Sequence, residues 1–286
     1  MEETDPSGRY KITSIRTLGN YVRCVATVIG KDKIYTARKI NRQSFYFSNF
    51  FDNFKNEFEI LSSISHPLIQ KFIEVSFDES VFYQIVEYED YNMLLHYKND
   101  FPLIESTAKI IFWNLLEALS YLHSNQIAHL DVRLENILII NGGFKLGGFL
   151  FSRRFAKGEL IEGFYGTPNF QAPEIFTSKK FDPVKADIWA CGIFLLSILL
   201  GKLPFECTNV SDSKSMTDVI RQQVLMNIFK FPDYLSEEVV DLLKLILVED
   251  PVKRPTIDRI KTHRWLQFPK PVNGEIMDLP LPSNLP

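Results

Sequence analysis

The most constraining stretch of this 286-residue chain lies near its middle, where two short apolar runs flank a turn signal. The first run, Ile137 to Ile140, is followed by Asn141-Gly142-Gly143, and the second begins at Phe144. Asn-Gly between apolar runs predicts a tight β-hairpin, because these residues accept the positive φ that such turns require. The loop before the hairpin holds Asp131 and, five residues later, Asn136. The sequence therefore predicts a polar loop and a hairpin at the centre of the chain.

Composition and charge narrow the class of protein. The chain is long enough for one large domain or two lobes, and 45% of its residues are hydrophobic. Its net charge is −3 and no basic block stands out, so nucleic acid and anionic membranes are not expected as partners. The longest apolar run, Ile193 to Leu200, is too short to cross a bilayer.

The termini and the cysteines bear on location. The first five residues are acidic and polar, which is unlike a signal peptide. Three cysteines without metal-type spacing are expected as free thiols in a reducing compartment. We therefore expect an intracellular protein, in the cytoplasm or the nucleus.

The first third of the chain alternates between strand and turn signals around one helix. Residues 1–9 are expected to form a disordered lead. Five runs read as strands: Tyr10–Leu18, Cys24–Ile29, Ile34–Ile40, Phe72–Phe77 and Phe82–Tyr88. Between the third and fourth, apolar residues recur at helical spacing from Phe50 to Leu61.

One charged residue on that helix is expected to be functional. Glu57 lies on the otherwise apolar face, and a buried carboxylate needs a partner because burying it unpaired is costly. Lys39, near the end of the third strand, is the obvious candidate. Seven aromatic residues between Phe45 and Phe58 exceed what one buried stripe needs, so some of them are candidates for a partner-docking surface.

The second half of the chain carries several ordered motifs. A long amphipathic helix, Glu105 to Ser124, leads into the central loop. Beyond the hairpin stand Gly-Thr-Pro-Asn-Phe-Gln-Ala-Pro-Glu (166–174), Asp-Ile-Trp-Ala-Cys-Gly (187–192) and Asp-Pro-Val-Lys-Arg-Pro-Thr (250–256). With His129–Asn136, these motifs resemble those of the eukaryotic protein kinase family over Tyr10–Leu266. Thr167 and Glu135 resemble the serine/threonine branch, and the ending His263–Leu266 resembles the calcium/calmodulin-dependent kinase group.

The resemblance implies an α+β, two-lobed fold. Its parts are an N-lobe at 10–88, a hinge at 89–92, a C-lobe at 93–266 and an extended, proline-rich tail at 267–286. The N-lobe is expected to hold five strands and one long helix.

The resemblance also implies a role for individual residues. Asp131 is the expected proton acceptor, Arg133 stands in for the lysine that assists it, and Asn136 is a metal ligand. The nucleotide side is expected to include Lys39 with Glu57 for the phosphates and Gly19 in the phosphate loop. The backbone of Glu87, Tyr88 and Glu89 at the hinge is expected to face adenine, with Ala26, Ala37 and Leu138 around it. Structural matches are the Glu174–Arg254 ion pair and an apolar column of Leu61, Phe72, His129 and Phe149, anchored by Asp187.

Several motifs depart from the family pattern. The hairpin ends in Gly148-Phe149-Leu150, so a glycine replaces the aspartate that is the main protein ligand of Mg²⁺, and no Asp or Glu occurs from 144 to 158. In the phosphate loop only Gly19 remains, because Tyr21 and Cys24 take the places of the other two glycines. Leu130 replaces the arginine before the catalytic aspartate, and Tyr165 is the only hydroxyl between Arg153 and Gly166.

Two functions remain open from the sequence. One is a pseudokinase, a kinase-fold binding, scaffold or allosteric protein in signalling with little or no transferase activity. The other is a divergent serine/threonine kinase that transfers the ATP γ-phosphate to protein. ATP is compatible with both, whereas the missing aspartate casts doubt on Mg²⁺. The expected partner or substrate is a protein, and the oligomeric state stays open.

Overall fold

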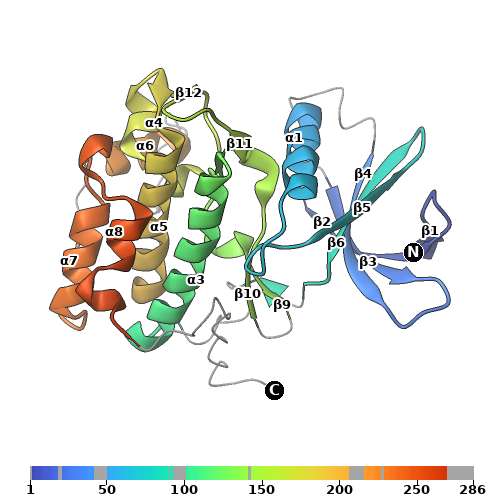
Figure 1. The fold of residues 1–286 in the computed structure, drawn as a ribbon, viewed down its shortest axis with the longest axis horizontal. Coiled ribbons are helices and arrows are strands. Elements are labelled where there is room, and N and C mark those ends of the chain that lie inside the picture. The colour runs from blue at the N-terminus through green and yellow to red at the C-terminus, as the bar shows by residue number, and fades with distance from the viewer. Residues whose placement is uncertain are drawn as a thin grey trace.

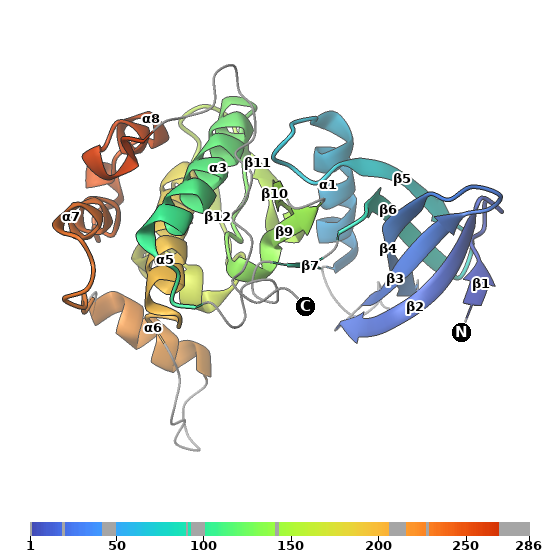
Figure 2. The ribbon, with the colours of Figure 1, turned by 90° about the horizontal axis from the view of Figure 1, so that it is seen from below.

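A computed structural model of the chain describes residues 2–18, 21–41, 50–89, 91–92, 101–140, 143–205, 216–226 and 229–268. Figures 1 and 2 show two lobes side by side, a β-sheet with one helix and a larger, mainly helical part. The expected α+β, two-lobed fold is confirmed. The hairpin with the central loop lies where the two lobes meet (Figure 1).

The N-lobe is built on one antiparallel sheet with the strand order β1-β2-β3-β4-β6-β5. Alternation of apolar and polar residues along these strands gives the sheet a small core on one face, which includes Ile12, Cys24, Ala37 and Ile85. The strands are β1 (Glu2–Thr4), β2 (Tyr10–Leu18), β3 (Tyr21–Val28), β4 (Ile34–Asn41), β5 (Phe72–Phe77) and β6 (Val81–Glu87).

The predicted disordered lead is wrong for residues 2–9. Strand β1 pairs with β2, so the sheet has six strands and not the expected five. The buried Asp5 carboxylate accepts hydrogen bonds from the backbone N–H groups of Ser7 (3.0 Å) and Tyr10 (2.6 Å), and from the hydroxyl of Ser76 in β5. The pairing of β1 with β2 and the bond from Ser76 to Asp5 order this segment through contacts with the sheet.

Helix α1 (Phe50–Ser63) packs against the sheet through its aromatic residues. Phe54 meets Phe82 edge-on at 6.2 Å between ring centroids, and Phe58 meets Phe72 at 5.3 Å. Part of the aromatic-rich segment, residues 42–49, lies outside the described residues, so the suggested docking surface stays a prediction.

The C-lobe is assembled around helix α5 (Pro183–Leu200). Asp182 caps its N-terminus by accepting from the backbone N–H groups of Val184 and Lys185, and Gly201 ends it in a left-handed conformation. Within the described part of the chain, α5 alone is long and apolar enough to cross a membrane, but 83% of it is buried in the lobe, as in a core helix. Around it lie α3 (Glu105–Ser124), α4 (Pro173–Thr177), α6 (Met216–Met226), α7 (Glu237–Ile246) and α8 (Ile257–Lys261).

Short elements complete the C-lobe and carry the central loop. The strands are β7 (Tyr91–Asn92), β8 (Ile127–Ala128), β9 (Ile137–Ile140), β10 (Gly143–Leu146), β11 (Arg153–Arg154), β12 (Ile161–Glu162) and β13 (Lys180–Phe181). Single 3-10 turns are η2 (Leu134–Asn136), η3 (Phe149–Phe151), η4 (Pro168–Phe170), η5 (Pro251–Lys253) and η6 (Arg264–Leu266).

The predicted hairpin links the two lobes. Strands β9 and β10 pair antiparallel, with Gly143 opposite Ile140. Leu146 donates its backbone N–H to Leu68 (2.8 Å) and accepts from that of Gln70 (3.0 Å), so β10 is fastened to the segment that enters β5. This backbone junction holds the central loop at the boundary between the sheet and the helices.

Candidate functional site

The central loop is held rigidly by one buried carboxylate. Asp187, in the first turns of α5, accepts the backbone N–H groups of His129 (2.8 Å) and Leu130 (2.7 Å). The ring of His129 donates to the carbonyl of Gly147 (2.9 Å) and meets Phe149 edge-on at 4.9 Å. The loop geometry therefore depends on the C-lobe core and on the hairpin together.

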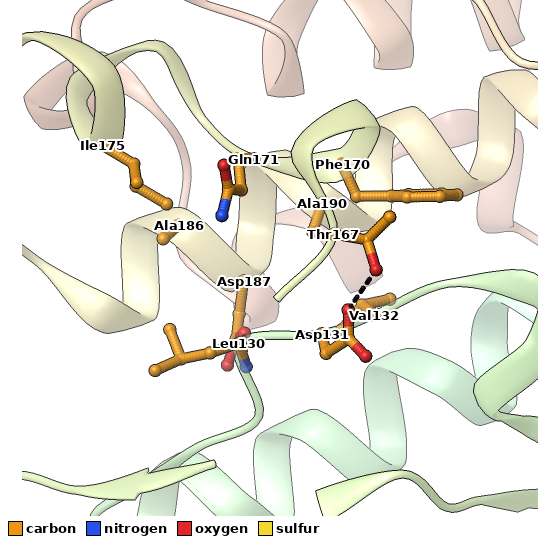
Figure 3. A pocket seen from close by; sticks show the side chains of 10 residues that line it. All are labelled: Leu130, Asp131, Val132, Thr167, Phe170, Gln171, Ile175, Ala186, Asp187 and Ala190. Atoms are coloured by element: carbon orange, nitrogen blue, oxygen red, sulfur yellow. Dashed lines mark hydrogen bonds between the residues drawn. The ribbon is translucent and has the colours of Figure 1, made fainter. Parts of the chain in front are cut away.

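Asp131 lies in a hydrogen-bond network with Arg133 and with Thr167 of the Gly-Thr-Pro motif. The hydroxyl of Thr167 donates to Asp131 Oδ1 (2.8 Å) and accepts from the Arg133 guanidinium (2.6 Å). Figure 3 shows Thr167 and Asp131 facing each other across this bond. The structure thus brings together the expected proton acceptor, the cation that assists it and the Gly-Thr-Pro turn.

The cavity behind Asp131 is too small to hold a ligand. Its volume is about 10 Å³, room for one water molecule, and Leu130, Gln171 and Asp187 line it (Figure 3). We therefore assign it to the packing of the loop.

Asn136 and Gly148 occupy the region where the resemblance expects a metal. The amide nitrogen of Asn136 donates to the Asp131 carbonyl (2.7 Å) and to Asp131 Oδ2 (2.8 Å). Gly148 has a left-handed backbone, with φ of 77°, and a Cβ added there would lie 2.2 Å from Asn136 Cγ. The side chain of Asn136 thus fills the space in front of Gly148, and the described residues hold no cluster of three His, Cys, Asp or Glu that could bind a metal.

The expected Lys39–Glu57 pair is wrong. Glu57 is fully buried, and both of its oxygens are bound by the neighbouring Arg38, at 3.2 and 2.6 Å. Lys39 points to the other face of the sheet, where its ammonium contacts both oxygens of Glu3 at 2.5 and 2.7 Å. Burial acts to raise the pKa of Glu3, but hydrogen bonds from Lys39 and Tyr83 and the Lys39 charge outweigh it and lower that pKa.

The register of the sheet explains the error. In β4, Arg38 is opposite Gln84 and Lys39 is opposite Tyr83, and successive side chains point to opposite faces. Arg38 and Lys39 are both basic and point to opposite faces of the sheet. A motif match that is shifted by one residue therefore selects Lys39 in place of Arg38 as the partner of Glu57. The predicted roles of Ala26 and Ala37 beside adenine are wrong for the same reason, because both alanines are buried in the core on the Lys39 face.

The remaining nucleotide-side residues lie close to the hinge. Leu138 is buried beside Gly147, and the Glu87 carboxylate accepts from Lys145 Nζ (2.7 Å) and from the backbone N–H of Lys71 (3.3 Å). Tyr88 is half-buried. Gly19 lies outside the described residues, and so do Asp90 of the hinge and the tail 269–286.

The structural matches are formed as expected. Arg254 and Glu174 make a buried bidentate pair with both distances at 2.6 Å. Leu61 and Phe149 belong to one continuous core that spans the lobes, and Phe72 packs against it. The ring of His129 meets that of Phe149 edge-on.

Sequence reasoning missed the roles of four polar side chains near the hinge: Arg23, Thr36, Gln70 and Glu89. Thr36 Oγ1 accepts from the backbone N–H of Glu89 (3.2 Å), and Arg23 forms an ion pair with the Glu89 carboxylate (2.8 Å). The signal in the sequence was weak, since each is an ordinary polar residue near a strand end. Once the register of β4 is known, alternation places Thr36 on the same face as Arg38.

Comparison with known proteins identifies the family. A protein kinase domain model matches residues 16–266. The serine/threonine-protein kinase SIK2 of Gallus gallus is 35% identical over 213 residues, which cover 74% of this chain and 26% of that protein. The serine/threonine-protein kinase SIK1 of Rattus norvegicus is 32% identical over 213 residues, which again cover 74% of this chain and 26% of that protein.

The match spans about a quarter of the length of these relatives. Membership of the family implies the use of ATP and Mg²⁺ in general. From the motifs, the two-lobed fold and these matches, the chain belongs to the protein kinase domain family, with serine/threonine kinases among its relatives.

Proposed function

We propose that this chain is a pseudokinase, a kinase-fold binding, scaffold or allosteric regulator in signalling with little or no phosphotransfer activity. The observation that carries the proposal is the position of Asn136. Its amide is bonded to Asp131 and lies against Gly148, which has no side chain. The two positions expected to hold a metal are therefore a glycine without a side chain and a neutral amide, so neither provides a carboxylate.

The residues at this position do not fit a Mg²⁺ ion. Mg²⁺ takes near-octahedral oxygen coordination and is usually held by one or two carboxylates. Of the metal ligands in the family pattern only Asn136 survives; its nitrogen is bonded to Asp131, so it offers one amide oxygen and no carboxylate. Loss of the metal removes several kcal/mol of transition-state stabilisation, roughly three or more orders of magnitude in rate.

The phosphate-binding side supports the same proposal. Arg38 takes the place of the lysine that the family pattern pairs with Glu57, and Lys39 lies on the opposite face of the sheet, bound to Glu3. Strands β2 and β3 stay paired up to Leu18 and Tyr21, so most of the expected phosphate loop is regular strand. A paired strand commits its backbone amides to the ladder and does not offer them to a phosphate.

A second function, a divergent active serine/threonine kinase, is favoured by one specific observation. The Asp131–Thr167–Arg133 network is complete, and it orients a carboxylate that can accept a hydroxyl proton. Either function has a protein as its partner or substrate; nucleic acid is not expected at a net charge of −3.

Phosphotransfer by the full chain separates the two functions. Wild type and Asp131→Asn are incubated with ATP, Mg²⁺ and a mixture of serine- and threonine-containing proteins. The pseudokinase predicts the same background rate for both proteins. A wild-type rate that Asp131→Asn abolishes would establish the active kinase instead.

The proposed location is intracellular, in the cytoplasm or the nucleus. Cys24 and Cys191 are buried and unpaired, and burial raises the pKa of both thiols, so they are expected to be unreactive. Microscopy of the tagged protein tests the location, and secretion into the medium would contradict it.

A further inference from the structure

Three side chains form hydrogen bonds with backbone groups of Glu87 and Glu89, at the end of β6 and the start of the hinge. The Glu89 N–H donates to Thr36 Oγ1 (3.2 Å), and the Glu89 carbonyl accepts from an Arg23 terminal nitrogen (3.2 Å). The Glu87 carbonyl accepts from Gln70 Nε2 (3.4 Å). These are the backbone groups of the segment that the family resemblance assigns to adenine, and all three have a partner within the protein.

The Glu89 carboxylate joins the hinge to strand β3 and to the segment before β5. One oxygen lies 2.8 Å from Arg23 Nε of strand β3, and the other accepts from Gln70 Nε2 (3.3 Å). The Arg23 and Glu89 side chains are 26% and 18% exposed, so the ion pair is partly shielded from water. On its other side Gln70 reaches the backbone at Gly147, because a Cβ there would lie 3.2 Å from Gln70 Oε1.

The network joins three segments that are separate in the sequence. Arg23 comes from the sheet, Glu89 from the hinge, and Gln70 from the segment joined to β10 by the backbone bond of 3.0 Å. A planar base that used the hinge N–H and carbonyl groups would have to displace Arg23 and Gln70. Glu89 would then remain as a partly desolvated carboxylate without its cation, which is unfavourable.

We propose that Arg23, Glu89 and Gln70 together occupy the adenine position, and that this network excludes adenine nucleotides whether or not Mg²⁺ is present. The proposal rests on the proposed function and extends it, because it places a second cause of lost nucleotide binding away from Gly148. Arg23 and Glu89 therefore determine whether this position accepts a purine, and a chain without their side chains is expected to bind one.

The test measures binding of adenosine and of ADP to the full chain by isothermal titration calorimetry in EDTA. Adenosine has no phosphates, so it probes the adenine position apart from the metal and phosphate sites. The variants are Arg23→Ala and the double variant Arg23→Ala/Glu89→Ala. The double variant removes both charges, so it leaves no unpaired Glu89 carboxylate that could disturb folding. Arg9→Ala is the matched control, because it removes an exposed arginine paired with Glu74 in the same sheet.

The expected result is no measurable adenosine binding by wild type or Arg9→Ala, and at least a tenfold gain in affinity for the double variant. Thermal unfolding confirms that each protein is folded. The proposal is overturned if wild type binds adenosine as tightly as the double variant, or if the folded double variant does not bind it at all. Wild type that binds adenosine but transfers no phosphate overturns this proposal alone, whereas a wild-type phosphotransfer rate that Asp131→Asn abolishes overturns the proposed function.

Discussion

The guanidinium of Arg38 binds the carboxylate of Glu57 with both of its terminal nitrogens, and the carboxylate is fully buried. A planar guanidinium matches the two oxygens of a carboxylate, which a lysine ammonium does not. This pair fixes α1 against the sheet. Asn56 adds a second link by donating to the Ser152 carbonyl at 2.5 Å, so the helix is also joined to the segment after Phe149.

Replacing Arg38 is expected to cost far more stability than replacing its neighbour. Arg38→Ala leaves the Glu57 carboxylate buried without its cation, a loss of about 3–5 kcal/mol in the free energy of unfolding. Lys39→Ala breaks a partly exposed pair with Glu3 and is expected to cost about 1 kcal/mol or less. Urea unfolding of both variants measures the difference, and equal losses would contradict the assignment of Glu57 to Arg38.

The segment from Gly148 to Glu174, which corresponds to the activation segment of the family, is expected to have no phosphorylation switch. Leu130 cannot pair with a phosphate, and Tyr165 already donates its hydroxyl to the Glu162 carbonyl (2.8 Å) while Arg153 lies over its ring at 4.5 Å. Arg153 also donates to Asn53 of α1, so this arginine holds the segment without a phosphate. Mass spectrometry of the cellular protein, with Tyr165→Phe as the control, measures this. A stoichiometric phosphate between Gly148 and Glu174 that alters activity or partner binding would refute it.

Gly148 and Asn136 are expected to be energetically coupled. A Cβ at residue 148 meets the Asn136 side chain, and the left-handed backbone adds a strain of about 1–2 kcal/mol for a non-glycine residue. Gly148→Ala should therefore lower the free energy of unfolding more in the wild type than in the Asn136→Ala variant. The expected difference is about 1 kcal/mol or more. A double-mutant cycle by denaturant unfolding measures the coupling, and strict additivity would show that Asn136 moves aside at no cost.

The sequence alone predicts that Gly148→Asp raises phosphotransfer if the other groups are poised. The structure changes this expectation, because Asn136 occupies the space that the new side chain needs. Gly148→Asp alone should leave the rate at background in the assay used for the wild type. A clear gain in the phosphotransfer rate would mean that the missing aspartate alone accounts for the lack of activity.

The N-terminal strand is expected to loosen in acid. Burial acts to raise the pKa of Asp5, but hydrogen bonds from Ser7, Ser76 and the Tyr10 backbone outweigh it and lower the pKa below its ordinary value of 3.8. Because the folded-state pKa is depressed, this stabilisation is complete above the unfolded-state pKa and is lost as the pH falls through the folded-state pKa. Glu3, whose pKa is also lowered, acts in the same direction.

Hydrogen exchange of residues 2–13 measured between pH 7 and pH 3 reports this loosening, after correction for the intrinsic exchange rate. The expected result is a fall in protection of β1 at the acid end, relative to the pairing of β3 with β4. Asp5→Asn should lower protection at pH 7 and flatten its dependence on pH. Protection of β1 that is constant over the whole range would contradict the role of Asp5.

The sequence by itself determined the fold class and the C-terminal half of the site. Helix α3 begins and ends at Glu105 and Ser124 as predicted, because its apolar periodicity runs uninterrupted over five turns. The sequence placed Asp131 and Arg133 in one loop, two residues apart, whereas the contact of both with Thr167 is seen only in the structure. The absence of a side chain at Gly148 is likewise a fact of the sequence.

Tertiary structure decided which cation meets Glu57 and what occupies the hinge. A strand alternates its side chains with a period of two, so one residue of register exchanges Arg38 for Lys39, and Thr36 for Ala37. Residues 2–9 became ordered through Ser76, a partner about 70 positions away that no local pattern reveals. Arg23, Gln70 and Glu89 come from three separate segments, and their network exists only because the sheet brings those segments to one place.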